Sequence, residues 1–90
     1  MDIKKIKESI NPRRFYEQEL GIRSSKTGWC DGGLCPFHAD RKAGSFKVNL
    51  ETGAFKCFSC DASGSDIIAF GQKVWGVNFL DAIKILQRDY

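Results

Sequence analysis

Two short pairs of metal-ligating residues constrain this 90-residue chain more than any other feature of its sequence. The first pair is Cys35 and His38, the second is Cys57 and Cys60, and two residues separate the members of each pair. A further 18 residues lie between His38 and Cys57. Such spacing is typical of two tight knuckles whose four ligands converge on one Zn²⁺ in a tetrahedron. The chain is therefore predicted to bind structural zinc, with no coordination position open for a reactive water.

A further cysteine, Cys30, leaves the ligand set open at this point. Four residues separate Cys30 from Cys35, so Cys30, Cys35, Cys57 and Cys60 also have the spacing of a zinc site, with His38 left outside. The alternative for Cys30 is a small, partly buried apolar residue. A redox pair is a third interpretation of the cysteines, but redox C-x-x-C motifs usually begin a helix after a buried strand and have no second ligand pair nearby.

Size and compartment favour a metal over disulfides. A chain of 90 residues buries a smaller fraction of its surface than a larger domain, so a core of side chains alone would be marginal. The N-terminus lacks the apolar run of a signal peptide, and no apolar stretch approaches the length of a membrane span. We therefore expect a cytoplasmic protein without a membrane partner, in which paired cysteines indicate metal chemistry.

Helical periodicity marks both ends of the chain. Ile3, Ile6 and Ile10 predict a short helix, and a second helix is expected from Pro12 to Leu20, with Gly21 ending it. A third helix is expected after Ser65, its candidate N-cap, and is ended by Gly76. Asn78 is the candidate cap of a last helix. The buried stripe of this helix is predicted to contain Phe79, Ala82, Ile83 and Leu86.

Residues 45–58 predict a β-hairpin, and a short strand is expected around Trp29 and Cys30. If Thr52-Gly53 is a two-residue loop, Leu50 faces Phe55 and Val48 faces Cys57. One face then collects the apolar residues Phe46, Val48, Leu50, Phe55 and Cys57, and the other holds Lys47, Asn49, Lys56 and Phe58. The expected fold is α+β, a zinc ribbon on a small antiparallel sheet flanked by N- and C-terminal helices. It forms a single domain over residues 1–90, with N-terminal helices in 1–22, ribbon and hairpin in 29–62, and C-terminal helices in 65–90.

Four runs of residues carry a resemblance to a known family. They are Leu34-Cys35-Pro36-Phe37-His38, Ser45-Phe46-Lys47-Val48, Phe55-Lys56-Cys57-Phe58-Ser59-Cys60 and the stretch from Ala62 to Phe70. Together they resemble the N-terminal zinc-binding domain of bacterial-type DNA primases. The resemblance implies one structural Zn²⁺ per chain, leaves Cys30 spare, and assigns the ligands as Cys35, His38, Cys57 and Cys60. The chain departs from the family pattern in lacking a proline between Asp40 and Phe46.

The same resemblance implies a role in DNA replication within a primosome. It implies recognition of single-stranded template DNA where a primer is to start, with a primase catalytic domain and a replicative helicase as partners and no small-molecule substrate. Primer synthesis in that family belongs to a separate domain with a cluster of acidic metal ligands. Residues 1–90 are therefore expected not to be an enzyme by themselves.

The polar face of the hairpin is the candidate nucleic-acid site. Lys47 and Lys56 would bind phosphates, Asn49 a base edge, and Phe58 would stack on a base. Arg41 and Lys42, in the loop after the first knuckle, would extend the positive edge. The alternative is that the lysines only keep the sheet soluble, and the excess of basic residues in 1–28 is open to the same two interpretations.

A second functional hypothesis uses the zinc ribbon differently. The chain would be an interaction module that docks a primase catalytic domain, a helicase or a replication initiator, with little DNA affinity of its own. Titration with single strands at low salt distinguishes the two hypotheses, because only the first predicts binding.

Overall fold

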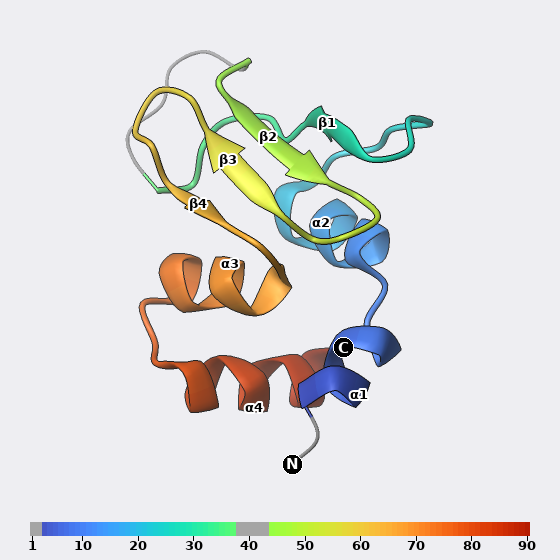
Figure 1. Cartoon of the computed structure of the whole chain (residues 1–90), viewed down its shortest axis with the longest axis vertical. Helices are drawn as coiled ribbons and strands as arrows, with labels where there is room; N and C mark the ends of the chain where they lie inside the picture. The colour runs from blue at the N-terminus through green and yellow to red at the C-terminus, as the bar shows by residue number, and fades with distance from the viewer. Residues whose placement is uncertain (1–2, 38–43) are drawn as a thin grey trace.

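Helices occupy both ends of the chain and a sheet lies between them, as the sequence predicts. The computed structural model describes residues 3–37 and 44–90 (Figure 1). Its elements are α1 (Ile3–Ser9), α2 (Pro12–Leu20), β1 (Trp29–Asp31), β2 (Phe46–Asn49), β3 (Phe55–Cys57), β4 (Ser63–Gly64), α3 (Ile67–Trp75) and α4 (Phe79–Asp89). The α+β class is confirmed. Within the described ranges, none of the helices combines the length and the apolar character that crossing a membrane requires.

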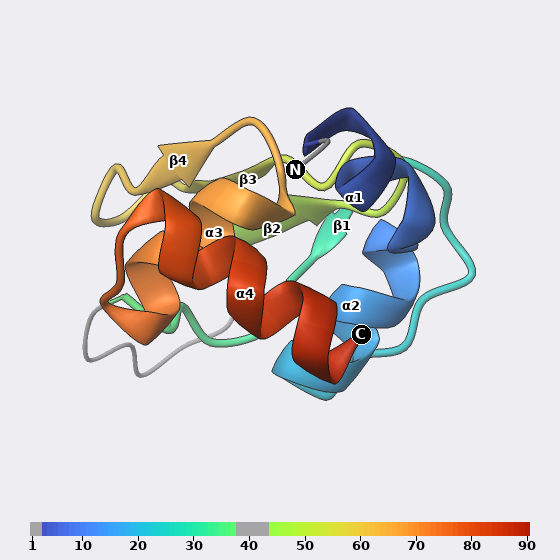
Figure 2. The same cartoon turned by 90° about the horizontal axis from the view of Figure 1, so that it is seen from below.

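The four strands pair antiparallel in the order β1-β2-β3-β4. Helix α2 lies behind this sheet in Figure 1, and α3 and α4 are stacked below it, as the view from below in Figure 2 also shows. The two-residue strand β4 was not predicted, because Ser63-Gly64 carries no β-sheet signal of its own. Gly64 pairs with Phe55, and a Cβ at Gly64 would come within 2.5 Å of the Phe55 ring, so the lack of a side chain permits this close pairing.

Capping residues set the helix ends close to where the sequence places them. Asn11 caps α2 by accepting a hydrogen bond from the Arg13 amide at 2.9 Å, and Asn78 caps α4 in the same way. Gly21 and Gly76 end α2 and α3 in the left-handed conformation. The predicted cap of α3 was wrong.

Asp66, not Ser65, caps α3. The Asp66 carboxylate accepts a hydrogen bond from the Ala69 amide at 2.8 Å. Its other oxygen lies 2.7 Å from the Lys7 ammonium, so the cap also ties α1 to α3. The choice between two adjacent candidate caps depends on this long-range ion pair, which local sequence does not contain.

The hairpin has the predicted faces but not the predicted register. Val48 pairs with Phe55 and Phe46 with Cys57, whereas a two-residue loop would have paired Val48 with Cys57. The register therefore differs from the predicted one by two residues. Because side chains alternate with a period of two along a strand, this shift leaves every side chain on its predicted face.

The loop is longer than predicted because Asn49 organises it. The Asn49 amide donates to the carbonyl oxygen of Ala54 at 2.7 Å, so residues 50–53 form the connection. The Asn49 side-chain oxygen accepts hydrogen bonds from the amides of Glu51 and Thr52 at 2.9 and 3.0 Å. Gly53 completes the turn with φ +85°, and its carbonyl oxygen accepts a hydrogen bond from the Tyr16 hydroxyl at 2.5 Å.

Aromatic rings fill the space between the sheet and the helices. The Phe70 ring of α3 packs against Phe15 and Tyr16 of α2 and against Phe46 and Phe55 of the sheet. These five side chains are at most 1% exposed. The residues Ala82, Ile83 and Leu86 of the predicted α4 stripe are fully buried, but the prediction for Phe79 was wrong, because Phe79 begins the helix at the end of the stripe and is 38% exposed.

Candidate metal centre and nucleic-acid interface

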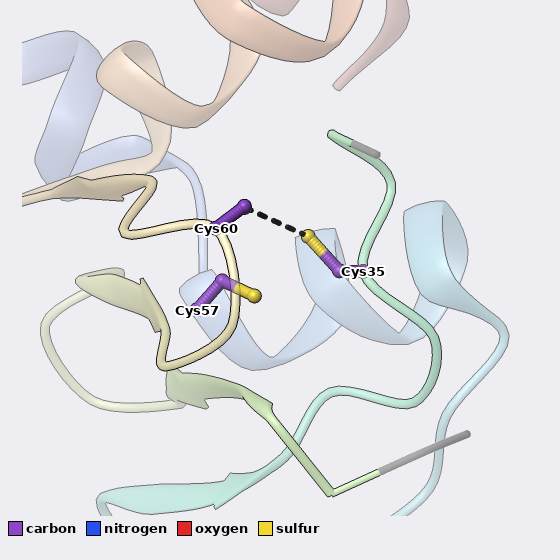
Figure 3. Close-up of side chains that lie close together, drawn as sticks. All are labelled: Cys35, Cys57 and Cys60. Carbon is purple, nitrogen blue, oxygen red and sulfur yellow. Dashed lines mark hydrogen bonds between the residues drawn. The ribbon is translucent and has the colours of Figure 1, made fainter. Parts of the chain in front are cut away.

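Three cysteines from the two predicted knuckles meet where β3 ends at Cys57. The sulfur atoms of Cys35, Cys57 and Cys60 all lie within 4.8 Å of one another, and the Cys35 and Cys60 sulfurs are 3.8 Å apart. Figure 3 shows these side chains converging from two separate segments of the chain. Within the described ranges, 3–37 and 44–90, this is the one group of three or more potential metal ligands whose ligand atoms lie this close together.

The spacing of the sulfurs fits zinc. Four sulfur ligands at the usual Zn–S distance of about 2.3 Å would lie about 3.8 Å apart along the edges of a tetrahedron. The Cys35–Cys60 separation of 3.8 Å has this value, and the other two sulfur separations are at most 4.8 Å. Thiolate sulfur is also a donor that Zn²⁺ prefers, so both the donor type and the geometry agree with a structural zinc site.

The environment of Cys35 explains why a cation would be needed there. Burial, the main cause, together with the neighbouring sulfurs of Cys57 and Cys60, raises the pKa of the Cys35 thiol to about 12, although a hydrogen bond from the Phe37 amide opposes the shift. A thiol with this pKa keeps its proton at neutral pH. A bound divalent cation stabilises the thiolate and so displaces the proton.

Each knuckle is held by contacts that the fold supplies. Phe37, inside the first knuckle, packs against Phe46, Phe55 and Phe70 of the core, with ring centroids 5.5–5.9 Å away. In the second knuckle, the Asp61 amide donates to the Cys57 carbonyl oxygen at 3.0 Å, and Asp61 adopts a left-handed conformation with φ +63°. The sulfurs are therefore positioned by the aromatic core and by a tight turn.

One other candidate ligand, Cys30, does not join this cluster in the structure. Cys30 pairs with Val48 in the sheet, is 4% exposed and belongs to the hydrophobic core. The geometry thus separates Cys30 from the group formed by Cys35, Cys57 and Cys60. His38 lies outside the described residues, as do the candidate DNA contacts Arg41 and Lys42.

The face of the sheet opposite the aromatic core carries a shallow hollow of about 440 Å³. We call it the outer groove, and its lining includes Lys26, Trp29, Asp31, Lys47, Lys56 and Phe58. Trp29 is 51% exposed and Phe58 is 70% exposed. Large aromatic side chains this accessible, beside lysines, form a surface suited to flat rings and negative charge.

Strand pairing sets the order of groups in the outer groove. Lys47 and Lys56 are directly opposite each other, and Asp31 is opposite Lys47 on its other side. Trp29, opposite Asn49, lies two residues from Asp31 along β1, and Phe58 follows β3 with its amide donating to the Ser45 carbonyl oxygen. The aromatic residues therefore lie on either side of the row of lysines.

Two of the candidate DNA contacts, Lys56 and Asn49, interact with other groups of the protein. The Lys56 ammonium is 3.1 Å from the Asp61 carboxylate, in a pair whose side chains are 33% and 89% exposed. Such an exposed pair is weak and is screened by salt, so it leaves Lys56 able to exchange partners. The Asn49 oxygen, in contrast, is engaged in the hairpin turn, and Asn49 is not part of the lining of the outer groove.

The sequence prediction missed Trp29 and Asp31 as members of this surface, whereas Lys26 was among the basic residues of 1–28 considered for DNA contact. The predicted short strand around Trp29 contained a signal, since Trp29 and Asp31 alternate with the buried Cys30. What placed them in the groove is the pairing of β1 with β2. Arg13, one of the basic residues considered for DNA contact, instead donates hydrogen bonds to the carbonyl oxygens of Ser24 and Lys26 and so holds the loop that leads to Trp29.

Comparisons with known proteins agree with this geometry. A family model described as CHC2 zinc finger matches residues 1–90. The chain is 41% identical over 81 residues to a DNA primase of Lactococcus lactis, 48% over 85 residues to one of Mycolicibacterium smegmatis, and 46% over 68 residues to one of Borreliella burgdorferi. These matches cover 90%, 94% and 76% of this chain but only 12–13% of each relative. The chain therefore spans about an eighth of the length of these primases.

Proposed function

The chain belongs to the CHC2 zinc-finger family, and from this premise we propose that it is a zinc-stabilised domain that recognises single-stranded template DNA. In this role it supports primer synthesis by a primase catalytic domain that residues 1–90 do not contain, and it catalyses no reaction by itself. The observation that carries the proposal is the outer groove, where two exposed aromatic side chains flank two lysines. The match to only 12–13% of the length of the related DNA primases supports the separation from catalysis.

Zinc has a structural role in this proposal. Cys35, Cys57 and Cys60 supply three ligands, and His38, which directly follows Phe37 in the first knuckle, supplies the fourth. One Zn²⁺ bound in this way cross-links the two knuckles and has no open position for a substrate or a water. The free energy of zinc binding in small domains is about 10–16 kcal/mol near pH 7, comparable to the entire stability of a domain of this size.

The outer groove binds the strand through two kinds of contact. Lys47 and Lys56 neutralise phosphates, and Lys26 adds a third positive charge beside them. Trp29 and Phe58 provide faces on which bases stack, a contact worth about 1–3 kcal/mol per base in other single-strand-binding proteins. Arg41 and Lys42 extend the positive edge in this proposal, whereas Asn49 keeps the hairpin turn and its side-chain oxygen does not read a base.

A titration with fluorescently labelled single strands tests the proposal. The zinc-loaded chain is expected to bind at low salt and to lose affinity as salt rises. In a plot of the logarithm of the binding constant against the logarithm of the salt concentration, the slope should be about −0.7 per phosphate neutralised. The double variant Lys47→Ala/Lys56→Ala should show a shallower slope, reduced by the contribution of roughly two phosphate contacts. Lys84→Ala, an exposed lysine on α4 outside the groove, is the matched control and should bind like the parent chain.

Stacking is tested separately with Trp29→Ala and Phe58→Ala. Each is expected to weaken binding by about 5- to 150-fold, corresponding to the loss of one stacked base. Absence of binding at low salt, or binding that neither salt nor these variants change, would refute DNA recognition. Retained association with a primase catalytic domain or a helicase in that case would support the interaction-module hypothesis.

A further inference from the structure

Asp31 is the acidic side chain in the lining of the outer groove. It lies on β1 directly opposite Lys47 and two residues from Trp29. One of its carboxylate oxygens, Oδ1, accepts a hydrogen bond from the Gly33 amide at 2.9 Å. This bond fixes the orientation of the carboxylate, and a carboxylate retains further lone pairs for other donors.

The position of Asp31 is unfavourable for binding a phosphate backbone. A carboxylate repels phosphates, and Asp31 reduces the positive potential of the very lysines that would attract them. Among the ion pairs found in residues 3–37 and 44–90, none joins Asp31 to Lys47. Neutralising a lysine is therefore not the role that the contacts give to Asp31.

The chemistry of a carboxylate restricts what it can recognise. An ionised carboxylate only accepts hydrogen bonds, so it pairs with an exocyclic amino group such as N4 of cytosine. Thymine and uracil present an oxygen at the same position, and that oxygen repels the carboxylate. A base stacked on Trp29 would lie next to Asp31 on the same strand, which brings its edge within reach of an acceptor whose orientation is fixed.

We propose that Asp31 is a base-selecting residue that accepts a hydrogen bond from the exocyclic amino group of a stacked base, and so favours cytosine over thymine or uracil at one position of the bound strand. The inference rests on the proposed function and deepens it. Lysines and aromatic rings bind any sequence, because every nucleotide has a phosphate and a ring face. Asp31 adds the discrimination that those contacts lack.

Homopolymers of deoxycytidine and deoxyuridine provide the test, since the two bases differ in the group at position 4 and the adjacent ring nitrogen. The zinc-loaded chain is expected to bind the deoxycytidine strand about tenfold more tightly, the size of one charge-assisted hydrogen bond. Asp31→Asn keeps an acceptor oxygen for the Gly33 amide but adds an amino donor. It should lose the preference for deoxycytidine and bind the deoxyuridine strand more tightly than the parent does.

Asp61→Asn is the matched control. It removes the same charge near the same lysines, because Asp61 pairs with Lys56, but Asp61 is not in the lining of the outer groove. It should raise the affinity for both strands equally and keep their ratio. If Asp31→Asn also raises the affinity for both strands equally and keeps their ratio, base selection is overturned while DNA recognition stands. The same holds if the parent chain binds both strands equally. Failure of the parent chain to bind any strand would overturn both proposals.

Discussion

Lys47 and Lys56 are directly opposite each other on the face of the sheet away from the core. Like charges at opposing positions of an antiparallel pair destabilise the pairing, and the exposed ion pair between Lys56 and Asp61 offsets only part of this repulsion. Folding by itself gains nothing from the arrangement. A polyanion lying across both strands would gain from it.

The first prediction separates these two effects at Lys47. Lys47→Gln should leave the free energy of unfolding within about 0.5 kcal/mol of the parent value, with any change toward greater stability, because it removes the repulsion. It should weaken single-strand binding at low salt. Urea denaturation and fluorescence anisotropy measure the two quantities on the same sample. A variant that unfolds more easily but binds DNA normally would show that Lys47 has a structural role instead.

The second prediction concerns the zinc ligands. Cys30→Ala should retain one zinc per chain, since Cys30 lies in the core apart from the three clustered sulfurs. His38→Ala should lose most of its zinc to a competing chelator. Atomic emission with chelator competition measures both. The reverse pattern, with zinc lost only in Cys30→Ala, would establish the four-cysteine site that the sequence also permits.

A third prediction follows from the two roles of Asp66. Asp66→Ala removes both the cap of α3 and the ion pair with Lys7, and should destabilise the fold by about 1–2 kcal/mol. Asp66→Asn keeps the capping oxygen, so it should cost less than about 1 kcal/mol, as should Lys7→Ala. Thermal unfolding of the three variants is the measurement. Equal losses in Asp66→Ala and Asp66→Asn would mean that the ion pair, not the cap, stabilises this junction.

The fourth prediction is an alkaline limit to stability set by Tyr16. Burial, with a smaller contribution from the Asp66 carboxylate, raises the pKa of the Tyr16 hydroxyl well above its ordinary value of about 10. Because the folded state disfavours the ionised phenol, this contribution to stability is fully present below about pH 10 and is lost as the pH rises further. Urea denaturation should show the free energy of unfolding of the parent chain falling as the pH is raised above about 10.

Tyr16→Phe tests that assignment. It leaves the Gly53 carbonyl oxygen without the Tyr16 hydroxyl and should cost about 1–3 kcal/mol at pH 8. Its stability should then fall less steeply than that of the parent above pH 10. If the two chains lose stability in parallel, the alkaline transition belongs to another group, and Tyr90, whose pKa is raised by burial and by Glu19, is the next candidate.

A fifth prediction concerns Arg13, whose guanidinium contacts the carbonyl oxygens of Ser24 and Lys26. Arg13→Ala should loosen the loop before Trp29 and weaken DNA binding, although Arg13 does not line the outer groove. Arg14→Ala, an exposed neighbour on α2, is the control with the same change in charge. Equal weakening by both variants would point to long-range attraction of the strand rather than to positioning of the loop.

Local sequence was sufficient for most elements of this fold. Asn11, Gly21, Gly76 and Asn78 determine helix ends through contacts within a few residues, so their roles were predictable. Period-two alternation assigned the two faces of the hairpin correctly even though the register was wrong. The register itself depends on how the Asn49 side chain organises residues 50–53, and a propensity for two-residue loops did not anticipate this.

What the sequence by itself determined is the chemistry that is available: a thiol and an imidazole, then two thiols, paired at the spacing of two knuckles, and lysines alternating with apolar residues along a hairpin. What only the tertiary structure decided is which of these groups meet. The pairing of β1 with β2 brings Trp29 and Asp31 beside Lys47, and it places Cys30 in the core while Cys35 joins Cys57 and Cys60. Strand pairing and core packing join residues far apart in the chain, and their free energy depends on contacts that no local pattern contains.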